Sequence, residues 1–164
     1  MTDIFQENVP FGWVYEIIKT VYKNPQHTFQ ILTKRPRRMK KFFDWLYNEQ
    51  YNNWVTFLNE EKIIPNLWLG VTVETQKECI ERIPIFLYIP SAVKFLSVEP
   101  MIKEIDLNDI RTIASRTIVT ITNCLNGIKN VYDRDNINVG KDIPINKIDW
   151  VIVGGETGAK SAVR

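Results

Sequence analysis

The segment Leu67-Trp-Leu-Gly-Val-Thr-Val-Glu74 decides the fold, because a mainly apolar run stops there at a carboxylate. Three further segments have the same form: Phe29 to Arg35, Val93 to Pro100 and Ile148 to Glu156. Near-continuous runs of Val, Ile and Leu are typical of strands buried in a parallel sheet, and sites in α/β folds form beyond the carboxyl ends of such strands. The residues expected to converge on this common rim are Lys34, Arg35, Glu74, Ser97, Glu99 and Glu156.

The composition is that of an ordinary globular domain. The chain has 164 residues, of which 45% are hydrophobic and 24% charged, and its formal net charge is +2. This length suits one hydrophobic core, and the small net charge excludes a polycation while leaving room for a local basic patch. No stretch approaches the ~18 apolar residues of a membrane helix, and the first residues lack the basic and apolar regions of a signal peptide. We therefore expect a single cytoplasmic domain over residues 1–164.

The cysteine content argues against a metal centre. The chain has two cysteines, Cys79 and Cys124, and one histidine, His27. Two isolated cysteines and one histidine do not make a four-ligand zinc site, and a reducing compartment disfavours a disulfide. We expect both cysteines to be small core residues.

Helical and strand patterns alternate up to Pro100. Apolar spacing predicts amphipathic helices over 11–24, 37–50 and 75–87, the last with a capping box at Thr75 and Glu78 and a kink or early end at Pro84. The apolar runs predict strands at 28–33, 67–73, 93–98 and 148–153. This order indicates right-handed βα units around a parallel sheet.

The predicted fold class is α/β, an incomplete (β/α) barrel with about four parallel strands and outer helices. Residues 101–147 interrupt the pattern, and their alternation and turn residues predict an irregular excursion with a short hairpin. An incomplete barrel leaves strand edges unpaired. We therefore expect homodimerisation, a docked partner, or cover of the edges by residues 101–147.

Four motifs in the chain resemble one known family. They are Leu32-Thr-Lys-Arg-Pro36, Asn66-Leu-Trp-Leu-Gly-Val-Thr-Val-Glu74, Phe95-Leu-Ser-Val-Glu-Pro100 and Ile148-Asp-Trp-Val-Ile-Val-Gly-Gly-Glu-Thr-Gly158. Together they resemble the phage gene-product 37/68 family of phages and mobile elements. The resemblance covers most of residues 3–158, and it implies a radical-SAM-like partial barrel in the cytoplasm of a host cell, with S-adenosylmethionine and a 4Fe-4S cluster as the family's cofactors.

The chain departs from that family in one decisive respect. Full-length relatives carry an N-terminal three-cysteine segment that resembles the ligand set of an iron–sulfur cluster, and this sequence has no such segment. Reductive cleavage of S-adenosylmethionine needs a cluster that delivers the electron. We therefore expect no bound cofactor, and a chain that corresponds to the middle of the family fold, truncated at both ends.

The residues at the strand ends have two readings. Glu74, Glu99 and Glu156 could bind an amine, ribose hydroxyls or a cation, but we favour carboxylates that pair with Lys34 and Arg35. The glycine-rich turn at Gly154, Gly155 and Gly158 could offer backbone N–H groups to a phosphate or carboxylate, and a simple tight turn fits it equally.

A basic stretch at residues 34–41 is the main candidate for partner binding. It contains Lys34, Arg35, Arg37, Arg38, Lys40 and Lys41. A solvated helix face is the simpler reading, and a patch for RNA, DNA or an acidic protein surface is the functional one. The residues predicted to contact a partner are Arg37, Arg38, Lys40, Lys41 and Trp54.

Two main functional hypotheses remain open on the sequence, beside a weaker third, a small-molecule or nucleotide sensor that uses the strand-end rim. The first is a non-catalytic, anti-CRISPR-like protein that binds and inhibits or modulates a host protein or ribonucleoprotein complex, with nucleic acid at residues 34–41. The second is a fragment or subunit of a radical-SAM-like enzyme that another chain completes. A cluster supplied by another chain would distinguish the second from the first.

Overall fold

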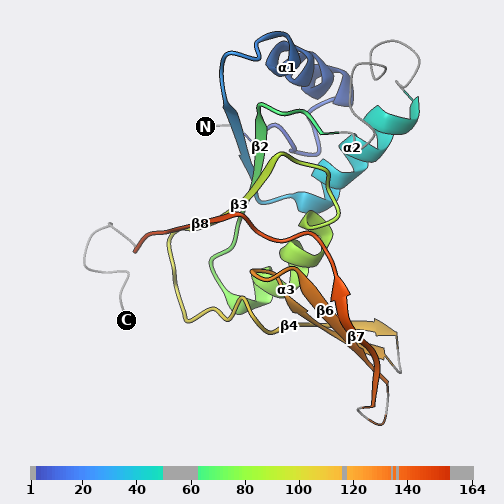
Figure 1. Ribbon diagram of the computed structural model, residues 1–164. Coiled ribbons are helices and arrows are strands. Elements are labelled where there is room, and N and C mark those ends of the chain that lie inside the picture. Colours follow the sequence, from blue (N-terminus) through green and yellow to red (C-terminus); the bar gives the residue numbers. More distant parts are fainter. Residues whose placement is uncertain (1–2, 50–62, 116–117, 134, 136, 156–164) are drawn as a thin grey trace.

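The computed structural model describes residues 3–49, 63–115, 118–133, 135 and 137–155. Figure 1 shows the order of the helices and strands along the chain. The helices are α1 (Phe11–Lys23), α2 (Pro36–Glu49) and α3 (Gln76–Phe86). The strands are β1 (Phe29–Thr33), β2 (Leu67–Thr72), β3 (Val93–Val98), β4 (Ile110–Ser115), β5 (Ile118–Asn123), β6 (Ile128–Tyr132), β7 (Asn138–Pro144) and β8 (Trp150–Val153).

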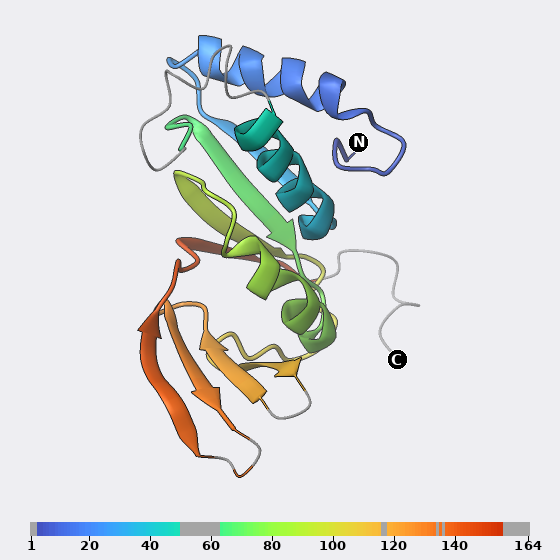
Figure 2. The ribbon, with the colours of Figure 1, turned by 90° about the vertical axis from the view of Figure 1, so that its right-hand side faces the viewer.

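The first sheet is parallel, with the strand order β1-β2-β3-β8. Leu69 lies opposite Ile31 of β1 and opposite Lys94 of β3, and Leu96 lies opposite Val151 of β8. Helices α2 and α3 cover one face of this sheet (Figure 2). Each of these helices connects one strand to the next, so the carboxyl ends of the strands meet at one edge of the sheet.

The second sheet is antiparallel and corrects the predicted fold class. Residues that were expected to form an irregular excursion instead form a four-stranded sheet in the order β4-β5-β6-β7. The prediction of an incomplete (β/α) barrel is wrong, because this sheet, and not an outer helix, connects β3 to β8. It lies beyond α3 at one end of the molecule (Figure 1).

Specific contacts attach the antiparallel sheet to α3. The Lys129 ammonium lies 3.3 Å from the Tyr88 hydroxyl, and the Asn146 amide donates to the Leu87 carbonyl at 2.9 Å. Residues 101–147 therefore cover the end of α3 and do not add a strand to the parallel sheet. In the described part of the chain β1 and β8 are the edge strands of that sheet, and homodimerisation stays a prediction.

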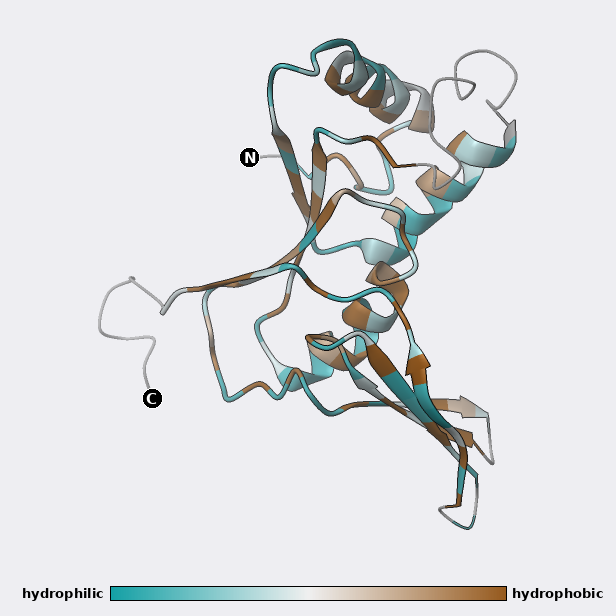
Figure 3. Ribbon diagram, viewed as in Figure 1, coloured by the Kyte–Doolittle hydropathy of each residue, from teal (hydrophilic) through white to brown (hydrophobic). Residues whose placement is uncertain are grey.

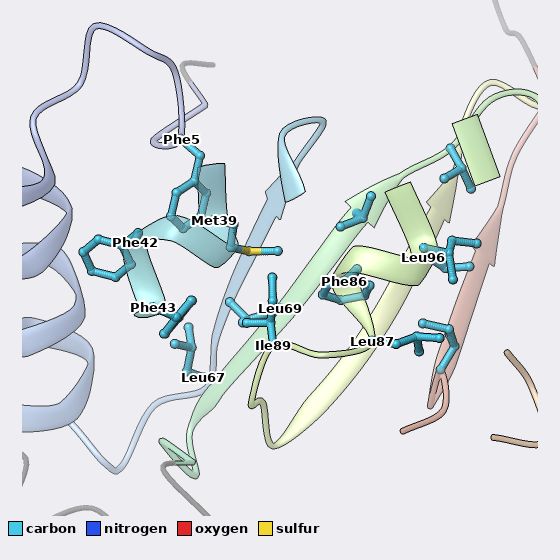
Figure 4. Close-up of a cluster of buried hydrophobic side chains, with 14 of the residues drawn as sticks. Phe5, Met39, Phe42, Phe43, Leu67, Leu69, Phe86, Leu87, Ile89 and Leu96 are labelled. Atoms are coloured by element: carbon cyan, nitrogen blue, oxygen red, sulfur yellow. The ribbon is translucent and has the colours of Figure 1, made fainter. Parts of the chain in front are cut away.

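The hydrophobic core lies between the parallel sheet and its helices (Figure 4). Alternation along β2 sends Leu67, Leu69 and Val71 into this core, and Val73 follows directly after the strand. The helices contribute buried aromatic and aliphatic side chains, among them Phe42, Phe43, Leu46, Ile83 and Phe86. Figure 3 shows the matching pattern of hydropathy, with hydrophobic residues along the parallel strands and mixed residues around the helices.

An aromatic cluster lies on the opposite face of the parallel sheet. Trp150 is 6.2 Å from Trp68 and 6.1 Å from Phe95, measured between ring centroids. The Phe95 ring lies across Gly70, where a Cβ atom would overlap it, so the strand needs a glycine at this position. None of the described helices is both long and apolar enough to cross a membrane.

Candidate functional site

The carboxyl ends of the parallel strands form a polar rim. Lys34 follows β1 and makes an ion pair with Glu74, which follows β2. Ser97 lies at the end of β3, where its carbonyl accepts from the N–H of Val73 at 2.9 Å. Ser97 is buried, so its main contribution is to the pairing of β2 with β3. The strand ends thus bring Lys34 and Glu74 together, from positions far apart in sequence.

Asp3 is a rim residue that the sequence analysis missed. Its carboxylate accepts from the Thr33 hydroxyl at 2.8 Å and pairs with the Arg35 guanidinium at 2.8 Å. Partial burial raises the pKa of Asp3, but hydrogen bonds from Phe5, Thr33, Arg35 and Lys34 outweigh it and hold the pKa below its ordinary value. Arg35 therefore pairs with Asp3, and not with a strand-end glutamate as expected.

Glu99 differs from the prediction made for it. Its side chain is exposed, and it makes no ion pair with Lys34 or Arg35 in the described structure. The Glu99 carboxylate instead lies against Gly154, where an added Cβ atom would overlap it. Gly155 has open space around its Cα, and Glu156 lies outside the described residues. Glu99 therefore does not hold the rim together through Lys34 or Arg35.

Arg38 has a structural role, and its predicted contact with a partner stays a prediction. Its guanidinium donates to the Gln6 carbonyl at 2.9 Å and to the Val9 carbonyl at 2.6 Å, and it pairs with Glu7 at 3.2 Å. It also stacks over the Phe11 ring, 4.6 Å from the centroid. Arg38 thus fixes the N-terminal segment to α2.

The other cations of the basic stretch divide into paired and unpaired side chains. Lys40 pairs with Asp44 one turn further along α2, at 2.7 Å. Arg37 and Lys41 are exposed and make no ion pair with any residue that the structure describes. Trp54 lies outside the described residues. Of the residues predicted to contact a partner, Arg37 and Lys41 are the two cations without an ion pair in the described part of the chain.

Two surface pockets open beside the rim and share Lys34 and Arg35. One, of about 320 Å³, is lined by Asp3, Gln6, Leu32, Thr33 and Thr72 in addition to the shared pair. The other, of about 290 Å³, is lined by residues 34–38 together with Glu7, Glu81 and Arg82. Arg82 belongs to α3, and the beginning of α2 lies beside that helix (Figure 2). We call this second cavity the basic pocket.

Comparison with known proteins places the chain in a family. Residues 1–163 match the family model described as a protein of unknown function (DUF5131). The chain belongs to the DUF5131 family. It matches no curated protein and no solved structure. The resemblance to the phage gene-product 37/68 family stays a prediction.

The cysteines of this DUF5131 protein do not fit an iron–sulfur cluster. Cys79 and Cys124 are buried, and burial raises the pKa of Cys79 to about 11 and that of Cys124 to about 12. Cluster ligands are thiolates, and a raised pKa keeps a cysteine in its protonated thiol form. The described residues also contain no group of three His, Cys, Asp or Glu side chains arranged to hold a metal ion.

Proposed function

We propose that this DUF5131 protein binds the nucleic acid of a host ribonucleoprotein complex and thereby inhibits or modulates that complex. The observation that carries the proposal is the basic pocket, whose lining contains Lys34, Arg35, Arg37, Arg38 and Arg82 against two carboxylates, Glu7 and Glu81. Four of these cations pair with Asp3, Glu7, Glu74 and Glu78, and Arg37 is exposed and has no ion-pair partner among the described residues. Arg37 is therefore the charge first available to an anion in this concave surface.

The type of cation favours phosphate as the anion. Four of the five cationic side chains in the lining are arginines. A guanidinium group presents planar, paired N–H donors that match two oxygens of a phosphate, which an ammonium group does not. Because nucleic acid offers phosphates at regular spacing, Arg37 and Lys41 on adjacent turns of α2 could engage neighbouring groups of one strand.

The host complex in this proposal comes from the resemblance to a phage family. A protein carried by a phage acts inside a host cell, where nucleic-acid-guided defence complexes are natural targets. A basic surface that holds nucleic acid would interfere with such a complex without any catalytic step. The contact itself can be tested without knowledge of the complex.

The test measures binding of a fluorescently labelled single-stranded RNA by anisotropy over a salt titration. We expect binding that weakens as salt rises, because bound phosphates release counterions. The variant R37E/K41E should bind at least about tenfold more weakly, the effect of roughly 1.4 kcal/mol. The matched control K23E/K141E makes the same change in net charge at exposed lysines of α1 and β7.

The control separates a local site from a general charge effect. An equal loss in both double variants would assign binding to net charge and contradict the proposed surface. Wild-type protein that fails to bind RNA at low salt, while its melting curve shows it is folded, would contradict the proposed function itself.

A further inference from the structure

The basic pocket has a more specific geometry than a flat basic patch. Two of its arginines are fixed in place by other contacts. Arg82 donates to the Thr72 carbonyl at 2.7 Å and pairs with Glu78 at 2.8 Å, and Arg38 is held by the carbonyls of Gln6 and Val9. Both side chains are mostly buried. Each is also ion-paired, Arg38 with Glu7 and Arg82 with Glu78, so they supply fixed guanidinium groups that lose little conformational entropy when an anion binds.

The remaining cations of the pocket are free to move toward a ligand. Arg37 is exposed and unpaired within the described residues. The Lys34–Glu74 and Arg35–Asp3 pairs are partly exposed, with 51% and 42% of the cationic side chains accessible. Exposed pairs of this kind contribute only about 0–1 kcal/mol, so a phosphate can replace the carboxylate partner at small cost.

Two features of the pocket restrict the kind of phosphate it takes. Its volume of about 290 Å³ lies at the lower end of the range of about 300–1,000 Å³ for ligand pockets, which suits the end of a strand better than a continuous backbone. Glu7 and Glu81 also line it, and they would repel a second phosphate beside the first.

We infer that the basic pocket binds the terminal phosphate of a nucleic-acid strand. A terminal phosphate carries a charge of about −1.5 to −2 near neutral pH, whereas each internal phosphodiester carries one negative charge. Several cations around one small cavity therefore favour the terminal group. The inference rests on the proposed function, since it specifies which part of the nucleic acid the same surface binds.

The experiment compares two single-stranded RNA oligonucleotides of identical sequence, one with a 5′-phosphate and one with a 5′-hydroxyl. We expect wild-type protein to bind the phosphorylated strand at least about tenfold more tightly than the hydroxyl strand. Only the phosphorylated strand can accept a charge-assisted hydrogen bond through its terminal phosphate. The variant R37A should lose most of this preference. The matched control K41A should keep it, because Lys41 lies one turn further along α2 and outside the pocket lining.

Three outcomes of this comparison distinguish the terminal-phosphate inference from the proposed function. Equal, salt-sensitive binding of both strands would overturn the terminal-phosphate inference and leave the proposed function standing. Binding of neither strand by folded protein would overturn both. A preference that survives in R37A but is lost in K41A would move the phosphate site out of the pocket and overturn the inference.

Discussion

Arg38 and Arg37 are adjacent arginines with opposite predicted roles, and alanine substitutions distinguish them. In Arg38→Ala, two hydrogen bonds to the carbonyls of Gln6 and Val9 are lost, together with the stacking over Phe11. Hydrogen bonds from charged groups contribute about 1.5–3 kcal/mol each and a cation–π contact about 0.5–1 kcal/mol. The ion pair with Glu7 adds little, because 83% of the Glu7 side chain is exposed.

The expected cost of Arg38→Ala is about 2–4 kcal/mol, less than the full sum of about 3.5–7 kcal/mol, because the site is only partly buried. For a domain of this size each kcal/mol lowers Tm by about 2–4 °C, so we expect a decrease of roughly 5–15 °C. Arg37→Ala should change stability by no more than about 0.5 kcal/mol, as is usual for exposed residues. Arg38→Lys should also be less stable than wild type, because one ammonium nitrogen replaces the two guanidinium nitrogens that donate to the carbonyls, and the planar stacking over Phe11 is lost.

Thermal unfolding followed by circular dichroism measures all three variants. Equal melting temperatures for Arg38→Ala and Arg37→Ala would refute the structural role of Arg38.

Three further predictions concern buried and paired ionisable groups. Lys94 is 5% exposed, and burial lowers its pKa despite the nearby Asp149, so the free energy of unfolding should rise as pH approaches the ordinary value of 10.5. Lys94→Met should stabilise the fold by about 1 kcal/mol in chemical denaturation at neutral pH. A less stable variant would contradict this. Cys79 and Cys124 should react with a thiol reagent only after unfolding, because burial and raised pKa values suppress the thiolate. Rapid labelling of folded protein would contradict their burial in the core. Because the pKa of Asp3 is lowered, its contribution to stability is present above the ordinary value of 3.8 and is lost as pH falls through the folded-state pKa. Asp3→Asn should therefore be less stable than wild type at neutral pH, and the two should converge in acid. A constant difference in Tm across pH would argue against the hydrogen bonds that Asp3 accepts from Phe5, Thr33, Lys34 and Arg35.

The parallel strands could be predicted because each is a local apolar run. The predicted ranges 28–33, 67–73, 93–98 and 148–153 agree closely with β1, β2, β3 and β8. The cap of α3 was equally local: the Thr75 side chain accepts from the Glu78 N–H, as the capping-box spacing predicts. The helix continues to Phe86 through Pro84, where the sequence indicated a kink or early end.

The antiparallel sheet was predicted only as a short hairpin in an irregular excursion, because its last strand resembles a loop in sequence. β7 contains Gly140, Asp142 and Pro144, all of which are uncommon within strands, and Asp142 has a φ of 49°. Its register with β6 is irregular as well. β7 pairs with the strand that directly precedes it, but its irregular register and its turn-type residues obscure the alternation that would mark a strand.

The candidate site was predictable in its position but not in its pairings. The strand ends indicated where charged residues would meet, and Lys34 with Glu74 is an example. Arg38 is different, because its partners are backbone carbonyls of Gln6 and Val9, which are present at every residue and carry no sequence signal. Arg82 was missed for a related reason: only the packing of α3 beside the beginning of α2 brings it into the basic pocket.

Binding of single-stranded RNA to R37E/K41E and to K23E/K141E, measured by anisotropy at several salt concentrations, tests whether the basic surface is a nucleic-acid site. We expect salt-sensitive binding by wild type and the control, and at least about tenfold weaker binding by R37E/K41E. Unchanged affinity in R37E/K41E would show that the residues at the beginning of α2 form an ordinary solvated helix face.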